Sequence, residues 1–556
     1  MPFFASRAAL YVLMVMTTFV VLLGHQSVPP MDRDESRFAQ ASRQMQQTGD
    51  YVTVRFQDEY RAKKPAGIYW LQSAFASLFD KDHIASYRFV NLLALLTAIF
   101  MIYHMASALY DARAALAAGA LLASGFLVLG EAHLAKTDTM LMTLAIVQQW
   151  ALMRVYLDRF APSHGGFNRW LWFWLAMTAG ILIKGPVLPA LALVTVLVLS
   201  LWHRDLRWLV GLRAGYGILV VLVLCLPWAI LVSVATDGAF LAGAIKGDFL
   251  AKVHSGQESH GAPPGVYALL AGVLIWPATP LLVSFFAGLR AFVKQPETLF
   301  LLAWLVPFWL VLELIPTKLP HYILPLLPAL ILLLVGAVIP PSPQDSFVLW
   351  RGYLAVALRY LGVSVGLVFA VIAIWGAMQF GGATSRSAMS FALVTTALCL
   401  LAVWCGHLWV SKRLWSPFFA MVGAALLMQL SFFSGVVPAL SRLHVSPTIA
   451  AAVAGLGKRP TAMAAAGYHE PSLVFHLGRD LLLVDGREAA LFLAEAPGGL
   501  AIVEMRQEAD FIATSRTLGL RLQPPIRLTG FNISKGEDVV ILLYRTEMFD
   551  AKADTE

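Results

Sequence analysis

The feature that most constrains this chain is a series of long apolar runs that recurs from near the N-terminus to about residue 437. A membrane-spanning helix needs about 20 consecutive, mostly apolar residues. About thirteen runs approach or reach this length, centred on residues 8–28, 86–109, 114–130, 138–157, 169–183, 186–202, 214–234, 266–288, 298–315, 321–340, 353–378, 388–410 and 415–437. The fifth and sixth runs are short and meet at Lys184-Gly185-Pro186, so they could form one broken span. We therefore expect an α-helical polytopic membrane protein with about thirteen transmembrane helices.

The composition agrees with a membrane protein and excludes several other classes. Of the 556 residues, 59% are hydrophobic and 13% are charged, whereas a soluble domain has about 45–50% apolar and about 25% charged residues. These values exclude a soluble enzyme, a disordered chain and a nucleic-acid-binding module. The net charge of +8 is expected to reside in loops, where it sets orientation, with attraction to anionic membrane lipids as a secondary effect.

The distribution of basic residues predicts the orientation in the membrane. One set of loops holds most of the cations, namely Arg113, Arg154, Arg159, Arg204, Arg207, Arg290, Lys294, Arg351, Lys412 and Arg413. The alternate loops are poorer, with Lys136, Lys184, Lys318 and Arg386 standing nearly alone. The positive-inside rule then places the N-terminus in the cytoplasm and the C-terminal region in the periplasm of a bacterial inner membrane. The first run lacks a small-residue cleavage site and is read as a retained anchor.

The chain divides into a transmembrane domain, 1–438, and a C-terminal periplasmic α/β domain, 439–556. Within the first, residues 29–85 form a long outer segment. Two amphipathic helices are expected there to lie in the membrane interface, at Glu35–Gln47 and Gly67–Phe79. In the C-terminal domain, short apolar runs predict strands and intervening segments predict helices. The strands are Leu481–Val484, Leu500–Val503 and Val539–Tyr544, and the helices are Pro471–Leu477 and Arg487–Leu493.

Polar residues gather in segments that this topology places on one side of the membrane. The segments are Asp32–Glu35, Arg61–Pro65, Lys136–Asp138, Lys246–Gly265 and Pro316–Tyr322. A structural role stays open for each of them, since Asp34 and Asp138 could simply cap helices. Their convergence on one face nevertheless predicts an active site at that membrane surface. A transporter would more often place polar residues in mid-span, along a central pathway.

Several of these segments resemble a known family. Asp34–Ala39, Gly49–Val52 and Lys64–Trp70 are similar to the first outer loop of the lipid A aminoarabinose transferases. Lys136–Asp138, Thr178–Gly185 and Lys318–Leu324 follow in the order found in that family. These enzymes are GT-C polytopic glycosyltransferases, a class that also includes the protein O-mannosyltransferases. The resemblance runs through roughly residues 30–335, and the later helices and C-terminal domain match in layout.

The resemblance implies transfer of a sugar from a polyprenyl-phosphate donor to lipid A, lipopolysaccharide or another envelope acceptor at the periplasmic side. Asp34 matches the family's essential first-loop aspartate, and Asp138 matches a second carboxylate. Lys64 matches the lysine that meets the donor phosphate, and Lys252 would serve the same phosphate if Asp248 and Lys252 align with the family's Glu-x-x-x-Arg. Lys318 and Arg37 are further candidates for binding that phosphate. The possible substrate contacts are Glu35, Tyr69, Asp248, His260, His321 and Tyr322.

One departure from the family concerns a metal. The family's Glu-Lys-Pro, whose acid is linked to zinc in the aminoarabinose enzyme, is Lys63-Lys64-Pro65 here, and Phe249 stands where a histidine is expected. We therefore predict no metal and no other cofactor. His254, Glu258 and His260 are the alternative ligands, since histidine and carboxylate suit zinc.

The expected chemistry is a direct displacement that inverts the anomeric carbon. Lysines stabilise the negative charge of the leaving polyprenyl phosphate. Asp34 acts as general base if the acceptor is a hydroxyl, or orients the substrates if the acceptor is an ionised phosphate. The alternative functions are a lipid or sugar transporter or flippase without covalent chemistry, and a scaffold with a periplasmic sensor domain.

Overall fold

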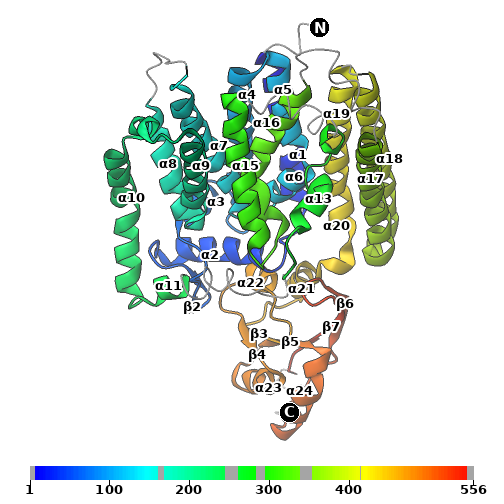
Figure 1. Ribbon diagram of the computed structural model, residues 1–556. Helices are drawn as coiled ribbons and strands as arrows, with labels where there is room; N and C mark the ends of the chain where they lie inside the picture. Colours follow the sequence, from blue (N-terminus) through cyan, green and yellow to red (C-terminus); the bar gives the residue numbers. More distant parts are fainter. Residues whose placement is uncertain are drawn as a thin grey trace, which may run out of the picture.

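The computed structural model describes residues 7–160, 168–244, 261–282, 295–338, 353–412 and 415–546. Most of them belong to a bundle of helices that run roughly side by side (Figure 1). The main helices of the bundle are α1 (Arg7–Ser27), α4 (Ile84–Leu109), α5 (Ala112–Ser124), α6 (Phe126–Ala132), α7 (Asp138–Leu157), α8 (Arg169–Lys184), α9 (Val187–His203), α10 (Ala214–Ala235), α13 (Val266–Leu274), α15 (Pro296–Leu314), α16 (Leu327–Val338), α17 (Tyr353–Phe380), α18 (Ser385–Lys412) and α19 (Trp415–Ser431).

The bundle has the dimensions of a membrane domain. Nine helices within the described ranges are long and apolar enough to span a membrane, and α5 and α6, bent by 58° at Gly125, form a tenth span if they are counted together. With 16 and 17 residues, α8 and α9 are shorter. Helix occurs within each of the thirteen apolar runs of the sequence. The polytopic helical class is therefore confirmed.

The first outer segment contains the two expected helices, α2 (Asp34–Thr48) and α3 (Gly67–Ala76). Two acids in the first turn favour the start of α2, and Gly49, with φ of 72°, ends it by donating its N–H to the Met45 carbonyl. Figure 1 shows α2 lying across the end of the bundle. Its apolar residues pack against α3, with the rings of Phe38 and Tyr69 stacked at 5.3 Å. A small hairpin, β1 (Arg55–Phe56) and β2 (Glu59–Tyr60), lies between the two helices in the chain.

The C-terminal region is a five-stranded mixed sheet with helices, which confirms the expected α/β class. The strand order is β4-β3-β5-β7-β6, with β4, β3 and β5 parallel and the last two antiparallel. Its elements are α21 (Val445–Ala454), β3 (Met463–Ala466), α22 (Pro471–Leu477), β4 (Leu482–Val484), α23 (Gly486–Glu495), β5 (Leu500–Glu504), α24 (Met505–Thr517), β6 (Ile526–Asn532) and β7 (Glu537–Tyr544). Sequence analysis did not predict β3, whose Met-Ala-Ala-Ala sequence lacks the β-branched residues typical of strands. The expected boundary at 438/439 falls in α20 (Val437–Ala439) and stays a prediction.

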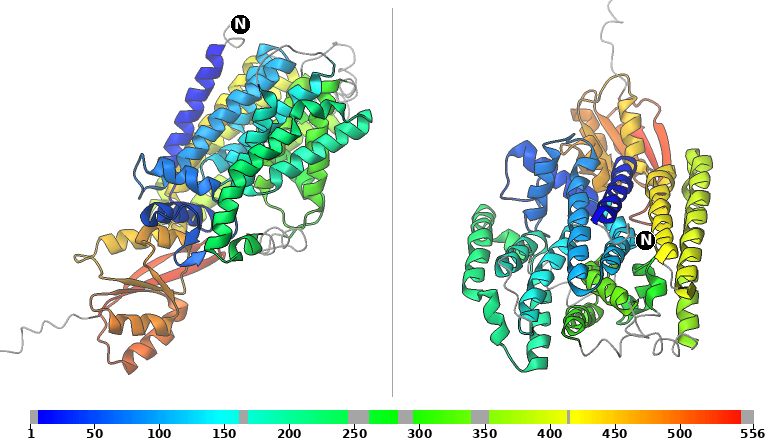
Figure 2. Two further views of the ribbon diagram at one scale, coloured as in Figure 1. Left: turned by 90° about the vertical axis from the view of Figure 1, so that its left-hand side faces the viewer. Right: turned by 90° about the horizontal axis from the view of Figure 1, so that it is seen from above.

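The N-terminal end of α1 and the C-terminal sheet lie at opposite ends of the bundle (Figures 1 and 2). The sheet region contacts the outer segment that carries α2. Arg43 donates to the Phe475 carbonyl at 2.8 Å and covers the Phe475 ring. Gln57 donates to the carbonyls of Arg479 and Leu481. These bonds join α2 and the hairpin to α22 and the turn that follows it, so the C-terminal region closes over the first outer segment.

A carboxyl group with a raised pKa, that of Asp32, lies at this contact. Asp32 accepts a hydrogen bond from the Ser472 amide at 3.3 Å. Burial, together with the nearby charge of Glu470, raises the pKa of Asp32 to about 6. The folded protein therefore binds the proton more tightly than the unfolded chain, and this group makes stability fall as pH rises from about 4 to about 6.

We expect Asp32→Asn to be more stable than the wild type at pH 7 by roughly 1–3 kcal/mol, because the substitution removes the cost of the buried charge. The difference should vanish below about pH 4, where Asp32 is protonated. Melting temperatures of the detergent-solubilised chain between pH 4 and 8 measure this, with Asp480→Asn, at a side chain that is 95% exposed, as the control. A variant that melts lower than the wild type at both ends of the range would contradict the expectation.

Candidate active site

A cluster of charged side chains lies at the end of the bundle nearest the C-terminal sheet. Glu131 comes from the last turn of α6, Lys136 from the loop that follows, and Asp138 from the first turn of α7. Lys184 ends α8, and His321 belongs to the short helix η5 (Pro320–Leu326). Three stretches that are distant in the sequence, residues 131–138, Lys184 and His321, thus meet at one point.

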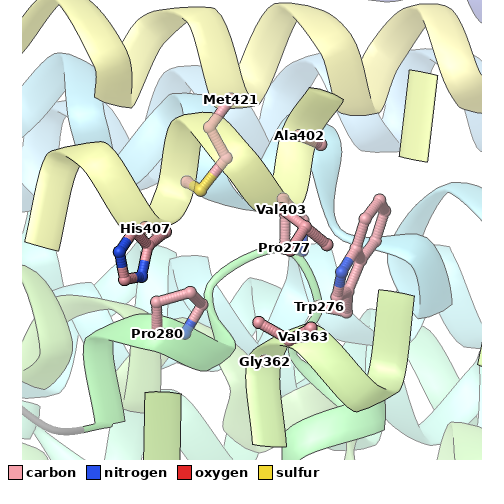
Figure 3. Close-up of a pocket in the computed structure, with 9 residues that line it drawn as sticks. All are labelled: Trp276, Pro277, Pro280, Gly362, Val363, Ala402, Val403, His407 and Met421. Carbon is pink, nitrogen blue, oxygen red and sulfur yellow. The ribbon is translucent and has the colours of Figure 1, made fainter. Parts of the chain in front are cut away.

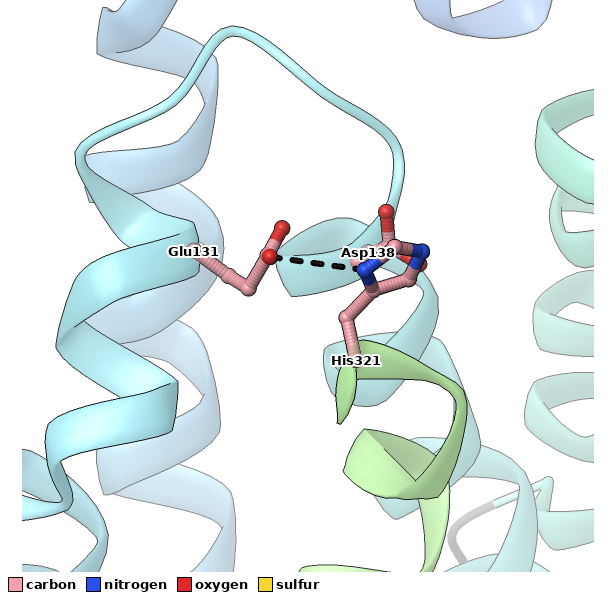
Figure 4. A group of neighbouring side chains, drawn as sticks. All are labelled: Glu131, Asp138 and His321. Atoms are coloured by element: carbon pink, nitrogen blue, oxygen red, sulfur yellow. Dashed lines mark ion pairs between the residues drawn. The ribbon is translucent and has the colours of Figure 1, made fainter. Parts of the chain in front are cut away.

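The cluster pairs each buried carboxylate with a lysine. Lys136 Nζ lies 3.0 Å from Glu131 Oε2, and Lys184 Nζ donates to Asp138 Oδ1. His321 lies between the two pairs, with Nδ1 3.6 Å from Glu131 Oε1 and Nε2 4.0 Å from Asp138 Oδ1 (Figure 4). A carboxylate at membrane depth is costly unless it is paired. The two lysines therefore stabilise the buried carboxylates of Glu131 and Asp138.

The loop that carries Lys136 is anchored by side chains from four helices. His25 of α1 contacts the Ala132 carbonyl at 2.9 Å. Glu35 of α2 accepts from the Ala135 amide at 2.8 Å, and Gln72 of α3 donates to the Ala135 carbonyl at 3.0 Å. Asn91 of α4 donates to the Lys136 carbonyl at 3.1 Å. Because all four bonds are to the backbone, they fix the path of the loop and leave the Lys136 side chain to the cluster.

Asp34 stands beside this cluster among several cations. Its side chain is 55% exposed, and its Oδ1 lies 3.8 Å from a terminal nitrogen of Arg61. Partial burial acts to raise the pKa of Asp34, but the charges of Arg61, Lys136, Lys64 and Arg37 lower it below the ordinary value. Burial likewise acts to lower the pKa of Lys136, whereas the neighbouring carboxylates raise it. At neutral pH Asp34 is therefore an accessible carboxylate and Lys136 a cation.

Glu35, a predicted substrate contact, has a structural position instead. Both of its oxygens accept from Arg88, at 2.7 and 2.8 Å, and they also accept from the amides of Ala135 and Met31. The side chains of Arg88 and Glu35 are 0% and 1% exposed. Glu35 thus ties α2 to α4 and to the loop before α7, and it does not face the space beside Asp34.

The other predicted site residues fall into two groups. Lys64, Tyr69, Arg37 and Tyr322 lie near the cluster or near Asp34. The charges of Lys64 and Arg37 act on Asp34, Tyr69 accepts from Arg61 Nε at 3.0 Å, and Lys184 Nζ lies 5.3 Å from the ring centre of Tyr322. Lys318 instead donates to the carbonyls of Glu313 and Ile315, where it closes the end of α15.

The phosphate-binding role of Lys318 stays a prediction, and so do the predicted roles of three residues outside the described ranges. These three residues are Asp248, Lys252 and His260.

Sequence reasoning did not single out Glu131. It ends an apolar run and is separated from its partners by several residues or by a whole helix, so only the isolated acid at the end of a span could have signalled it. Lys184 was named as a sparse loop cation, at a junction of two short runs and in a segment resembling the family, but not as a site residue, and Arg61 was named only as part of a basic turn. All three become prominent because of what lies next to them in space.

Comparisons with known proteins place these observations in context. The family model for dolichyl-phosphate-mannose-protein mannosyltransferases matches residues 63–231. A crystal structure of ArnT from Cupriavidus metallidurans bound to undecaprenyl phosphate superposes with a TM-score of 0.74 at 20% identity, covering 97% of this chain and 98% of the other. The chain has the GT-C fold of the aminoarabinose transferases. It is a multi-pass membrane protein, and its expected resemblance to that family is confirmed.

Sequence similarity to aminoarabinose transferases is confined to part of the chain. The undecaprenyl phosphate-alpha-4-amino-4-deoxy-L-arabinose arabinosyl transferase of Pseudomonas paraeruginosa (strain DSM 24068 / PA7) is 29% identical over 323 residues, 57% of each protein. The enzyme of that name from Yersinia pestis (strain Pestoides F) is 27% identical over 309 residues, 54% of each. The matched region thus spans little more than half the length of these curated relatives.

The aminoarabinose transferase resemblance also raises the question of a metal. Lys63 is a cation at the position of the family's acidic ligand, so the family's zinc site does not fit here. Glu131, Asp138 and His321 offer ligand atoms that all lie within 4.8 Å of one another. Each of these carboxylates is already compensated by a lysine, and two ammonium groups so close would repel a divalent cation. The absence of a metal stays a prediction.

Proposed function

We propose that this chain is an integral membrane glycosyltransferase that moves a sugar from a polyprenyl-phosphate donor to lipid A, lipopolysaccharide or another envelope acceptor. The observation that carries the proposal is the meeting of Asp34 and the Asp138 cluster with Lys64, Lys136 and Lys184 at one end of a GT-C bundle. The named activity of the relatives and the undecaprenyl phosphate bound to the superposed structure support the choice of donor.

In this proposal the lysines stabilise the negative charge that develops on the leaving phosphate. Lys64 is the main candidate, because it is part-exposed and close enough for its charge to act on Asp34. Asp138, held by Lys184, positions the sugar. A direct displacement transfers the glycosyl group to the acceptor oxygen and inverts the anomeric carbon, while the phosphate leaves with the electron pair of the broken bond.

The lowered pKa of Asp34 bears on its role. A carboxylate that stays ionised well below neutral pH is a weak general base, since proton transfer is most efficient when the pKa lies near the working pH. Such a group is well suited to orienting substrates whose acceptor oxygen is already ionised. The position of Asp34 therefore favours a phosphate acceptor over a hydroxyl.

The proposed orientation places the N-terminus in the cytoplasm of a bacterial inner membrane and the active site in the periplasm. The basic loops that alternate with the polar outer segments support it through the positive-inside rule. In this orientation the C-terminal sheet region is periplasmic and covers the outer segment next to Asp34.

The test is a comparison of envelope lipids by mass spectrometry in a deletion strain, with and without the wild-type gene. A species heavier by one sugar should be absent from the deletion and return with the wild type. Lys64→Ala, expressed at an equal level, should lower its formation by about 100–1,000-fold, because one electrostatic stabiliser of the leaving group is removed. Lys81→Ala, at an exposed lysine of the same outer segment, serves as the control.

Two outcomes would contradict the proposal. If no glycoform changes while unmodified lipid accumulates on the cytoplasmic side, the chain is a transporter. If Lys64→Ala restores the modified species as fully as the wild type does, Lys64 is only a solvated residue of a basic turn.

A further inference from the structure

A hollow that could take a ligand lies beside Asp34, between α2, the β1–β2 hairpin and the end of α11 (Ala239–Ala242). It encloses about 410 Å³. A second cavity, among α17, α18 and α19 and lined by Trp276, His407 and Met421, encloses only about 20 Å³ (Figure 3), which is room for about one water molecule. The larger hollow, called the outer groove here, has the size of a ligand-binding site.

The charge of the outer groove is predominantly positive. Arg37, Arg61 and Lys63 line it, against the single carboxylate of Glu59. Phe56 and Tyr60 add aromatic surface to its lining, and the Tyr60 ring lies under the Arg55 guanidinium at 4.2 Å. Aromatic and basic residues together are typical of surfaces that meet amphiphilic lipid head groups.

Arg61 is held in place before any ligand binds. Its Nε donates to the Tyr69 hydroxyl at 3.0 Å, and its guanidinium lies 4.9 Å above the Phe38 ring. The side chain is 7% exposed, and one terminal nitrogen is 3.8 Å from Asp34. A planar guanidinium fixed at its Nε presents its remaining donors in a set direction, which matches the oxygen geometry of a phosphate. Arg61 thus connects the outer groove directly with Asp34.

Lys63 and Lys64 are adjacent in the chain, but they act at different places. Lys63 is an exposed residue that lines the outer groove. The Lys64 charge acts on Asp34, and Lys64 does not line the groove. Where the resembling family has an acidic residue, this chain has the Lys63 cation. This difference changes the charge of the position by two units.

We propose that the outer groove binds a phosphate group of the acceptor lipid through Arg37, Arg61 and Lys63, next to Asp34. This inference rests on the proposed transferase function, and it assigns the acceptor and the donor to different cations. The acceptor phosphate lies over Arg61 and Lys63, and the donor phosphate lies over Lys64. The three cations offset the repulsion between an acceptor phosphate and the Asp34 carboxylate.

The experiment measures binding with the full chain in nanodiscs, so it does not depend on transfer. The probes are bisphosphorylated lipid A, lipid A stripped of both phosphates, and undecaprenyl phosphate. Lys63→Glu should weaken binding of bisphosphorylated lipid A by about 10–100-fold, the cost of losing one charged hydrogen bond and adding repulsion. Binding of undecaprenyl phosphate and of dephosphorylated lipid A should stay within about twofold of the wild type.

Lys81→Glu is the matched control, because it makes the same charge change on an exposed side chain of the same outer segment. Two results overturn the inference: bisphosphorylated lipid A binds the wild type and Lys63→Glu equally, or does not bind the wild type at all. A third is that Lys63→Glu weakens undecaprenyl phosphate binding instead, which assigns the groove to the donor. If lipid A binding depends on Lys63 but no sugar is transferred in cells, the outer groove stands and the proposed transferase function fails.

Discussion

Replacing Asp34 with asparagine is expected to lower the rate of sugar transfer by about 100–10,000-fold, the range for a positioned acid–base or orienting group. The substitution keeps the size of the side chain and removes the charge that faces Arg61 and Lys136. Because Asp34 is 55% exposed, its loss should leave the folded chain intact. Initial rates with purified protein, donor and acceptor in nanodiscs measure the effect.

Two further variants separate the role of Asp34 from a general loss of charge. Asp58→Asn, at an exposed aspartate of the hairpin turn, should transfer sugar at the wild-type rate. Arg61→Gln removes a cation that lowers the pKa of Asp34, so it should move the acid limb of the pH–rate profile to higher pH. An Asp34→Asn variant with full activity would falsify the catalytic assignment and leave Asp34 as a residue of the first turn of α2.

The second large effect concerns stability: Arg88→Ala is expected to cost about 3–5 kcal/mol, the range for breaking a buried ion pair by removing one partner. Arg88 donates to both oxygens of Glu35 and to the carbonyls of His25, Val28 and Pro29. Truncation leaves a buried carboxylate and three carbonyls without these donors. The melting temperature of the detergent-solubilised chain, followed by fluorescence-detected size exclusion, should fall sharply.

A double variant tests whether the uncompensated charge is the cause. Arg88→Met combined with Glu35→Met should be more stable than Arg88→Ala alone, because it removes both charges and keeps apolar volume. Arg459→Ala, at an exposed arginine of the C-terminal region, controls for loss of a cation. An Arg88→Ala protein that melts like the wild type would show that water reaches Glu35 and that the pair does not hold α2 to α4.

These two predictions distinguish neighbouring acids that look alike in the sequence. Asp34 and Glu35 are consecutive, yet one faces solvent among cations and the other is enclosed by Arg88. Asp34 should therefore respond to substitution through activity, and Glu35 through folding. The ion pair also has a functional consequence, because it fixes the N-terminal end of α2 and hence the place of Asp34.

Much of the fold was predictable because a lipid environment admits few solutions. Backbone groups inside a bilayer must be paired within the chain, so an apolar run of about 20 residues has to be a helix. The acids at the start of α2 and Gly49 at its end mark that helix in the sequence. The short apolar runs of β5 and β7 were equally easy to recognise as strands. Strand β3 was not, because its alanines acquire their strand conformation only from pairing with β4 and β5.

The sequence by itself thus determined the membrane class, the positions of the helices, the two-helix outer segment and the end of the bundle where polar residues gather. Which charges pair with which was decided only by the tertiary structure. Glu35 and Arg88 are 53 residues apart in the chain, and Glu131 meets His321 from another helix. Electrostatic energies depend on the distance between charges and on their burial. Neither quantity follows from the sequence without the tertiary structure. That is why the family's site residues could be named in advance, whereas the buried role of Glu35 and the groove beside Arg61 could not.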